Sequence, residues 1–400
     1  MLALLGGSPA FAAPLHVGRP NRGQYEQFEG RMRGIWDRNW LTNDGPMVRE
    51  FEAALASFLD VPHCVAVCNA TIGLEIASRA LGLTGEVIVP SFTFVASAHC
   101  LRWQGIRPVF CDADHRSHQL SVESVENLIT DQTTGILAVH LWGNAAPIEE
   151  LTALAERKNL KLLFDAAHAI GSTHQQRPIG AFGDAEVFSF HATKCINSFE
   201  GGVITTRSEE LAQKMRLMRN FGFAGYDRVI HVGTNGKMTE VCAAMGLTSL
   251  ENANQIFAAN RANLELYTEQ LRQLPGIRVR QPNAGEKSNC QYVVAEIEAD
   301  ELGLTRDQLQ AVLHAENVLV RRYFYPGCHR MEPYRSEPES TPQPLPVTES
   351  LTDRVLQFPT GTTVSETMIR RITEIVESAH AQAAAIRDYW DRRTAGGQLA

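Results

Sequence analysis

The feature that most constrains the fold is an alternation between residues 60 and 210, where short apolar runs are separated by segments of helical length. We expect strands at 64–67, 87–89, 109–111, 136–139, 162–164, 186–190 and 203–205. Between two of them, Ile72, Ile76 and Ala80 recur at helical spacing. Strands that alternate with helices are typical of a mainly parallel sheet covered on both faces. The sequence therefore predicts an α/β domain built on a seven-stranded, mainly parallel sheet.

The pattern changes after residue 248. A long polar helix is expected at 252–274, followed by short strands at 277–279 and 292–297 and a helix at 306–316. A chain of 400 residues with 44% hydrophobic side chains is long enough for two cores. We therefore expect an N-terminal segment and large α/β domain at 1–248 and a small C-terminal α+β domain at 249–400.

Two segments near the C-terminus have clear local signals. Four prolines between residues 336 and 347 predict an exposed loop without regular structure. Ser365 is a suitable N-cap for a final helix whose buried stripe is Met368, Ile369, Ile372 and Val376. Residues 394–400 are expected to fray.

Charge and cysteine content exclude several classes of protein. The 37 Lys and Arg against 45 Asp and Glu give 37 − 45 = −8, without long runs of one sign, which argues against nucleic-acid or anionic-membrane binding. No stretch approaches the roughly 20 apolar residues of a membrane helix. The eight cysteines form no CxxC pair, so we expect no metal site. The apolar start lacks basic residues and breaks at Gly6-Gly7, which disfavours a secretory signal, and we expect a cytoplasmic protein.

A lysine between two predicted strands is the first candidate for chemistry. Lys194 lies in Ser189-Phe-His-Ala-Thr-Lys194, after one apolar strand and before another. Burying an ammonium group is costly unless the amine is neutral or bonded, and an imine with an aldehyde removes that cost. On this segment alone, the alternative of a lysine that reaches solvent beside a turn is favoured.

The second candidate is Asp165, which ends the apolar run Leu162-Leu-Phe-Asp165. At the carboxyl end of a parallel strand a carboxylate faces the crevice where ligands bind. A carboxylate there can keep a pyridine nitrogen protonated, which makes the ring an electron sink. Asp165 and Lys194 are therefore interpreted together as a pyridoxal phosphate (PLP) site, with a helix cap as the alternative role of Asp165.

Two further segments fit such a cofactor. Cys68-Asn-Ala70-Thr71 joins a predicted strand to a helix, and a helix N-terminus with a hydroxyl is a phosphate cradle. A plain N-cap explains Thr71 equally well. In Pro90-Ser-Phe-Thr-Phe94 an aromatic ring at a strand end can lie on a heteroaromatic ring, although core packing is the alternative.

Eight segments in order resemble the nucleotide-sugar aminotransferases, the DegT/StrS type of fold-type I PLP enzyme, over nearly the whole chain. They are Trp40-Leu-Thr-Asn-Asp-Gly-Pro46, Phe51-Glu52, Cys68-Asn-Ala-Thr71, Pro90-Ser-Phe-Thr-Phe94, Asp165-Ala-Ala-His168, Ser189-Phe-His-Ala-Thr-Lys194, Glu200-Gly-Gly202 and Gly233-Thr-Asn-Gly-Lys-Met238.

The resemblance implies a role for each matching position. Lys194 forms the internal aldimine, the Schiff base with the cofactor, Asp165 pairs with the pyridine nitrogen, and Phe94 stacks on the ring. The residues that hold the phosphate are Ser189, Ala70 and Thr71. Many relatives have glycine at the position of Ala70, whose side chain requires an ordinary backbone conformation there.

Other matching positions concern the substrate and the partner subunit. Asn235 resembles the asparagine that reaches the phosphate of the neighbouring subunit, which implies a homodimer with shared active sites. His168 stands beside the ring and favours amination at carbon four over carbon three of the sugar, with a structural histidine as the alternative. Tyr323 and His329 resemble the substrate-side loop.

The function implied is transfer of an amino group, with glutamate as donor, to a nucleotide-linked 4-keto-6-deoxy sugar such as dTDP-4-keto-6-deoxyglucose, through pyridoxamine phosphate and by ping-pong kinetics. Lys194 is then also the general base. The alternatives are a 3-keto-sugar aminotransferase, a PLP-dependent sugar dehydratase or lyase, and a non-catalytic scaffold. The presence of Lys194 and Asp165 argues against the last two.

Overall fold

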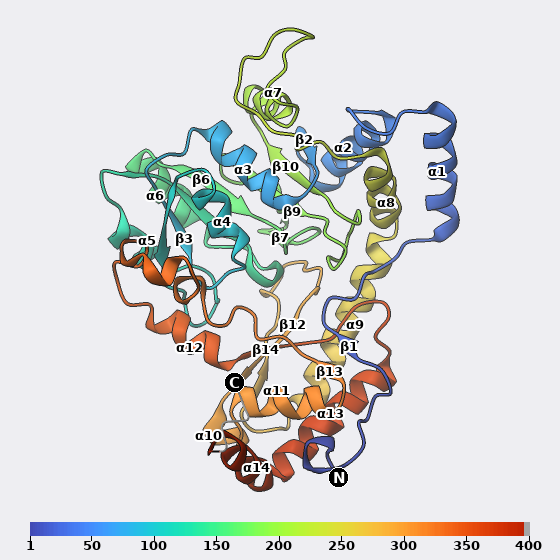
Figure 1. Ribbon diagram of the computed structural model, residues 1–400, viewed down its shortest axis with the longest axis vertical. Coiled ribbons are helices and arrows are strands. Elements are labelled where there is room, and N and C mark those ends of the chain that lie inside the picture. The colour runs from blue at the N-terminus through green and yellow to red at the C-terminus, as the bar shows by residue number, and fades with distance from the viewer. Residues whose placement is uncertain (396–400) are drawn as a thin grey trace.

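The larger part of the protein is an α/β unit around a seven-stranded sheet of order β2-β10-β9-β6-β5-β3-β4 (Figure 1). The computed structural model describes residues 1–395. The strands are β2 (His63–Val67), β3 (Glu86–Pro90), β4 (Arg107–Cys111), β5 (Thr133–Val139), β6 (Lys161–Asp165), β9 (Ala185–Ser189) and β10 (Gly202–Thr206). Only β10 runs antiparallel to its neighbours, β2 and β9. The predicted mainly parallel sheet is confirmed, and every predicted strand overlaps an observed one, although β4 and β5 begin two and three residues earlier than predicted.

Helices cover both faces of this sheet because side chains along each strand alternate between two cores. In β6, Leu162 and Phe164 belong to one hydrophobic cluster and Leu163 to the other. The first cluster contains side chains of α2 (Pro46–Leu59), α5 (Val122–Leu128), α6 (Ile148–Lys158) and α8 (Glu240–Glu251). The second contains side chains of α3 (Ala70–Leu81), α4 (Ala96–Arg102) and α7 (Glu209–Met218). Helix α1 (Tyr25–Arg38) lies against α8.

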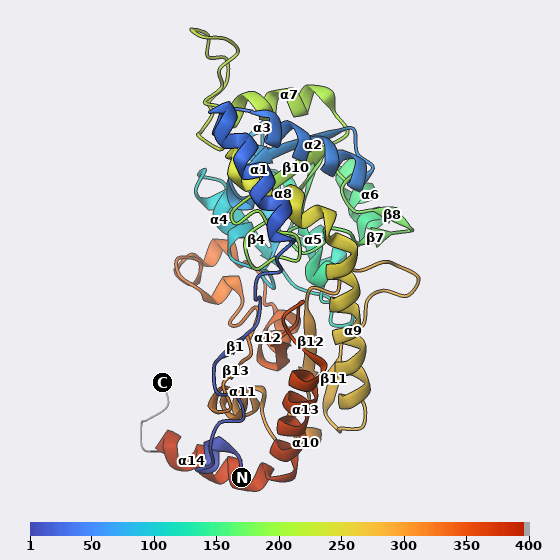
Figure 2. The same cartoon turned by 90° about the vertical axis from the view of Figure 1, so that its right-hand side faces the viewer.

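The smaller part contains an antiparallel three-stranded sheet. In Figure 2 this part lies below the larger one, with helices around it. Its strands are β11 (Ile277–Val279), β12 (Val293–Ile297) and β14 (Val355–Phe358). The helices are α9 (Ala253–Leu271), α10 (Ala299–Leu302), α11 (Arg306–Ala315), α13 (Glu366–Ala381) and α14 (Ala383–Ala395). Strands β7 (Thr173–His174) and β8 (Arg177–Pro178) form a separate hairpin in the larger part. The predicted α+β character of the C-terminal half is confirmed.

The final helices follow the predicted local signals. The Ser365 side chain accepts a hydrogen bond from the backbone N–H of Met368 and caps α13. Ile369, Ile372 and Val376 are buried in the small core, with Met368 partly buried beside them. Of the residues predicted to fray, 396–400 lie outside the described residues, whereas α14 continues to Ala395.

The N-terminal segment packs with the smaller part, which corrects its assignment to the large domain. Leu2 and Leu15 belong to the hydrophobic cluster of the C-terminal helices. The Glu316 carboxylate accepts hydrogen bonds from the backbone N–H groups of Ala3 and Ala10, at 2.7 Å each. Strand β1 (Leu15–His16) also pairs with β13 (Val318–Leu319). The division near residue 248 stays a prediction, but residues 1–16 do not belong on its large-domain side.

The proline-rich segment is more regular than predicted. It contains single turns of 3-10 helix at Tyr334–Ser336 and Pro338–Ser340, and α12 (Pro346–Arg354) begins at its last proline. Proline suits the first turn of a helix because the N–H that it lacks has no intrahelical partner there. Most of the segment is exposed, as predicted, although Ser340 and Leu345 are buried. The prediction that it contains no regular structure is wrong.

No helix among residues 1–395 combines the length and apolar character needed to cross a membrane. The eight cysteines are all free thiols. Within the same residues, no group of three or more His, Cys, Asp or Glu side chains is arranged to hold a metal ion.

Candidate active site

A cavity of about 610 Å³ opens at the carboxyl ends of β5, β6 and β9, where α/β sheets bind their ligands. Residues from the small part, such as Arg321 and Phe324, close it from the other side. Eight of the ten predicted site residues line this cavity: Ala70, Thr71, Phe94, Asp165, His168, Ser189, Lys194 and Tyr323.

Lys194 lies in the turn between β9 and β10 and is half-buried. Its Nζ donates a hydrogen bond to the Tyr292 hydroxyl at 2.9 Å. Burial lowers the pKa of the Lys194 amine to about 8, although the Asp165 carboxylate favours the charged form. Roughly a tenth of the amine is therefore neutral at pH 7, far more than for an ordinary lysine, and the neutral form is the one that reacts with an aldehyde.

Asp165 is the last residue of β6, and its side chain is buried at the cavity wall. Its carboxylate accepts hydrogen bonds from Ser97 Oγ at 2.7 Å and from the backbone N–H of Ala167 at 3.0 Å. Burial raises the pKa of Asp165, and these hydrogen bonds and Lys194 oppose the rise. Residues 166–171 form turns, so Asp165 is not the cap of a helix.

The N-terminus of α3 forms another wall of the cavity. Asn69, not Thr71, is the N-cap, since Asn69 Oδ1 accepts a hydrogen bond from the backbone N–H of Ile72 at 2.9 Å. The N-cap alternative for Thr71 is therefore wrong. The first N–H groups of a helix have no intrahelical partner, so those of Ala70 and Thr71 remain available for an anion. Ala70 is helical, which is the ordinary conformation expected from its side chain.

Glycine at position 202 allows β10 to approach this helix start closely. A Cβ atom on Gly202 would lie 2.8 Å from the Ala70 nitrogen and 2.9 Å from the Asn69 carbonyl carbon. Both contacts are with backbone, which cannot move without displacing the helix N-terminus. The shape of the cradle therefore depends on the absence of a side chain at this position.

His168 is buried beside Lys194 and the aromatic side chains of Trp142 and Tyr292. The backbone N–H of Trp142 donates to His168 Nδ1 at 3.4 Å, and the His168 carbonyl accepts from Asn289 Nδ2 at 2.8 Å. Burial, and next the Lys194 charge, hold the pKa of His168 well below its usual range. The ring is therefore neutral near pH 7.

Two predicted residues are not part of this cavity in the chain. Asn235 is exposed, in a segment that pairs with Asn220. His329 is buried elsewhere, with Nδ1 2.6 Å from Ser91 Oγ and Nε2 3.5 Å from a Glu349 oxygen. The His329 ring therefore contacts Ser91 and Glu349 and does not line the cavity.

Sequence reasoning missed several residues of the cavity. Tyr292, Arg321, Phe324 and Glu200 also line it. Tyr292 begins the predicted strand at 292–297, but nothing in the local pattern distinguishes a site tyrosine from a core tyrosine. Tyr292, Arg321 and Phe324 reach the cavity only through the packing of the small part against the large one.

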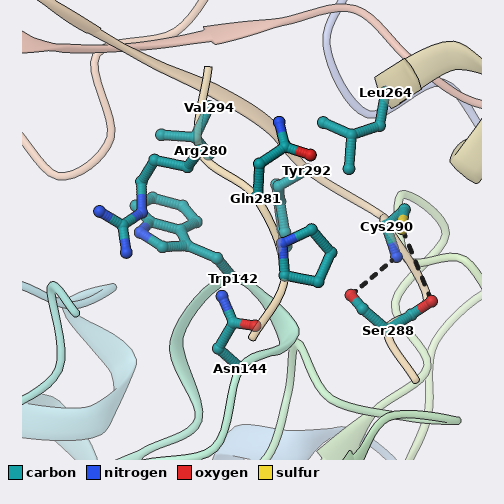
Figure 3. Close-up of a pocket in the computed structure, with 10 residues that line it drawn as sticks. Trp142, Asn144, Leu264, Arg280, Gln281, Ser288, Cys290, Tyr292 and Val294 are labelled. Atoms are coloured by element: carbon teal, nitrogen blue, oxygen red, sulfur yellow. Dashed lines mark hydrogen bonds between the residues drawn. The ribbon is translucent and has the colours of Figure 1, made fainter. Parts of the chain in front are cut away.

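A second cavity of about 20 Å³, the size of a water site, shares a lining residue with the first, and Figure 3 shows the residues around it. Tyr292 lines both cavities, and Trp142 and Arg280 line the small one. Figure 3 shows the Trp142 indole beside the Arg280 side chain. The aromatic wall of the site is thus backed by polar groups of the small part.

The site fits a phosphorylated pyridine aldehyde. It combines an amine of lowered pKa, a buried carboxylate and a helix N-terminus with free N–H groups around one cavity. These groups match an aldehyde, a ring nitrogen and a phosphate, respectively.

Comparison with known proteins also indicates an aminotransferase. The sequence profile of the DegT/DnrJ/EryC1/StrS aminotransferase family matches residues 24–377. A dTDP-4-amino-4,6-dideoxy-D-glucose transaminase of Shigella dysenteriae is 37% identical over 322 residues, which is 80% of this chain and 87% of that protein.

Two solved structures are also similar. The crystal structure of DesI in the presence of its TDP-sugar product superposes with a TM-score of 0.93 at 45% identity, covering 98% of this chain and 99% of that chain. The structure of DesV of S. venezuelae in complex with a ketimine intermediate superposes with a TM-score of 0.81 at 28% identity, covering 89% and 94% of the two chains.

Proposed function

Since the chain belongs to the DegT/DnrJ/EryC1/StrS aminotransferase family, which is PLP-dependent, we propose that it transfers an amino group from glutamate to C4 of dTDP-4-keto-6-deoxyglucose. Its relatives support this substrate, because one is named for a 4-amino-4,6-dideoxyglucose nucleotide and another was crystallised with a TDP-sugar product.

The observation that carries the proposal is the convergence of Lys194, Asp165 and the start of α3 on one cavity. Each group alone has an ordinary explanation. A cofactor site explains why all three lie at neighbouring strand ends around one cavity, which is large enough for a cofactor and part of a substrate.

In the proposed mechanism, each residue acts on a stated atom. PLP, when bound, supplies the electron sink that stabilises negative charge at the donor's α-carbon. Lys194 Nζ would hold the cofactor covalently and, as a free amine, would carry the proton removed from that carbon. The Asp165 carboxylate keeps the ring nitrogen protonated.

The remaining residues bind and orient. The N–H groups of Ala70 and Thr71, together with the hydroxyl of Ser189, hold the phosphate. Phe94, which is 53% exposed at the cavity, covers the ring. Tyr323 is the candidate contact of the sugar, and His168 lies beside the ring, where it favours C4 over C3. We do not propose substrate contact for His329, because Ser91 and Glu349 engage its ring.

We further propose a homodimer in which Asn235 reaches the phosphate of the partner's cofactor. Asn235 is exposed and lies outside the cavity of its own chain, as this role requires. The cytoplasmic location predicted from the sequence stays a prediction.

The experiment is a single half-reaction. The protein is loaded with pyridoxamine phosphate and mixed with dTDP-4-keto-6-deoxyglucose, with its 3-keto isomer in parallel. We expect the 4-amino sugar and conversion of the cofactor to the aldehyde form, with slower or no reaction of the 3-keto isomer. The Lys194→Ala variant is the control and should keep the fold but lose turnover.

Other products would redirect the proposal. A deoxygenated keto sugar would identify a dehydratase, and faster amination of the 3-keto isomer would overturn the assignment to C4. Full transamination by Lys194→Ala would remove the proposed role of that lysine.

A further inference from the structure

One strand of the small part supports two groups of the active site. Along β12, Val293, Ala295 and Ile297 belong to the small core. The alternate residues face the large part: Tyr292, just before the strand, binds Lys194, Val294 joins a core of the large sheet, and Glu296 pairs with His118. The period of two along a strand places these three on one face.

Glu296 is the anchor of a buried polar chain. Its side chain is 1% exposed and its oxygens lie 2.6 Å from Arg278, 3.1 Å from Arg280 and 3.2 Å from His118 Nε2. Arg280 also donates to the Ser117 carbonyl at 3.0 Å, next to His118. The carboxylate is therefore ionised and held in place.

The partners of His118 fix where its ring carries a proton. Trp142 Nε1–H donates to His118 Nδ1 at 3.4 Å. An indole N–H can only donate, so His118 Nδ1 must be unprotonated. The single ring proton is then on Nε2, which lies 3.2 Å from a Glu296 oxygen without hydrogen-bond geometry, so the carboxylate holds this proton by charge.

Trp142, whose indole is held by His118, also contacts the active site. Its indole stacks on Phe324 at 5.2 Å and on His168 at 5.9 Å, with interplanar angles of 13° and 19°. Its backbone has φ 60°, a left-handed conformation that costs energy for a residue with a side chain. In this conformation its N–H donates to His168 Nδ1 at 3.4 Å.

We propose that Glu296, His118 and Trp142 form a positioning relay that holds His168 with Nδ1 as acceptor and Nε2–H directed to the cofactor cavity. The inference rests on the proposed function, since it assigns His168 to the cofactor site. In this state His168 can donate a hydrogen bond without adding a second positive charge beside Lys194.

The relay predicts how His168 responds to pH. The groups that face its ring are Lys194, the neutral Tyr292 hydroxyl and the Trp142 backbone N–H. Protonation of Nδ1 requires that N–H to move away. If the indole loses its anchor, the backbone N–H loses its fixed direction, and His168 should become protonated as the pH falls toward its usual range.

The test compares matched variants. Trp142→Phe keeps an aromatic ring but lacks the indole N–H. His118→Asn keeps an acceptor for that N–H and suits the left-handed backbone at His118, which has φ 63°. His118→Phe keeps bulk but removes the acceptor. His168→Gln, which cannot titrate, serves as the background for the double variant with Trp142→Phe.

The first readout is independent of turnover. In protein with ¹⁵N-labelled histidine, the His168 ring signals, identified by their loss in His168→Gln, should report a neutral ring with the proton on Nε2 down to pH 6 in the wild type. Trp142→Phe and His118→Phe should show a charged His168 at that pH, and His118→Asn should resemble the wild type.

The second readout is the pH profile of kcat for the cofactor-loaded enzyme. Trp142→Phe should lose roughly tenfold in kcat at pH 6, with an acidic limb that the wild type lacks, while KM changes little because Trp142 does not line the large cavity. In the His168→Gln background, Trp142→Phe should add no acidic limb.

Several results would overturn the relay. They are an unchanged His168 signal and pH profile in Trp142→Phe, or an acidic limb that persists with His168→Gln. If Trp142→Phe does not fold, His118→Asn and His118→Phe are compared instead. Equal His168 signals in these two variants would contradict the proposal. A wild type that neither binds PLP nor transaminates contradicts the proposed function instead.

Discussion

At the scale of residues, some charged residues of the site could be predicted from the sequence, whereas some of its aromatic residues could not. Asp165 and Lys194 could be predicted because each interrupts or follows an apolar strand, where a charge needs a reason. Tyr292 and Trp142 could not, because aromatic residues in apolar runs are usually core, and only tertiary packing brings them to Lys194 and His168.

The lowered pKa of Lys194 predicts how the apoprotein captures PLP. The neutral amine attacks the aldehyde. Below the pKa of about 8, the capture rate should therefore increase about tenfold for each unit by which the pH is raised, and it should level off above that pKa. Stopped-flow absorbance of the lysine-linked cofactor measures this. A rate that still rises steeply above pH 10 would mean that burial does not lower this pKa.

Tyr292→Phe removes the hydroxyl that accepts from Lys194 Nζ. A hydrogen bond of about 1.4 kcal/mol corresponds to about tenfold in rate, so kcat should fall by roughly that factor. Steady-state kinetics check this, with Tyr323→Phe as the control that should change the KM of the sugar nucleotide instead. Equal effects of the two substitutions on kcat would contradict a specific role for the Tyr292 hydroxyl.

At the scale of elements, the strands of the large sheet could be predicted from the sequence, whereas β14 of the small sheet could not. Central strands are continuous apolar runs, because both of their faces are buried, and this signal is strong. Strand β14 has only four residues and follows a helix that starts at a proline, so its short pattern is lost beside the proline-rich segment. The sequence predicts the start of α3 at the phosphate cradle, but it does not identify Asn69 as the cap, a role considered only as the alternative for Thr71.

The close approach of β10 to α3 predicts the effect of a single methyl group. Gly202→Ala would press a Cβ against the Ala70 and Asn69 backbone, and overpacking of this kind typically costs about 1–3 kcal/mol. If the helix start shifts, PLP affinity should fall about 5- to 150-fold in a cofactor titration.

Gly30→Ala is the matched control. Nothing lies within 4 Å of its added Cβ, and Gly30 is inside α1. This variant should keep full cofactor affinity and be slightly more stable to heat. Wild-type affinity in Gly202→Ala would show that the cradle does not depend on this contact.

At the scale of the whole molecule, the sequence predicted two parts but misplaced the first 16 residues. Their local pattern does not specify which core receives Leu2 and Leu15, because that choice depends on Glu316 and β13, some 300 positions away. The loop between α7 and α8, at the top of Figure 1, carries exposed apolar side chains, among them Phe221, Tyr226 and Val232. A surface of this kind supports the proposed homodimer.

Shared active sites predict complementation. Lys194→Ala lacks the covalent anchor and Asn235→Ala lacks the proposed contact with the partner's phosphate. After subunit exchange, mixed dimers contain one site with both residues intact, so activity at limiting PLP should exceed that of either variant alone. Exchange without any gain in activity, with dimers verified by light scattering, would argue that each subunit completes its own site.

The central claim is that the Lys194 amine holds the cofactor, and chemical trapping tests it most directly. The protein is loaded with PLP, reduced with borohydride and digested, and the modified lysine is identified by mass spectrometry. Lys237, whose pKa is also lowered by burial, is an internal control, since it lies outside the cavity. We predict a stoichiometric label on Lys194 and none on Lys237. A label on another lysine, with Lys194 unmodified, would contradict the account.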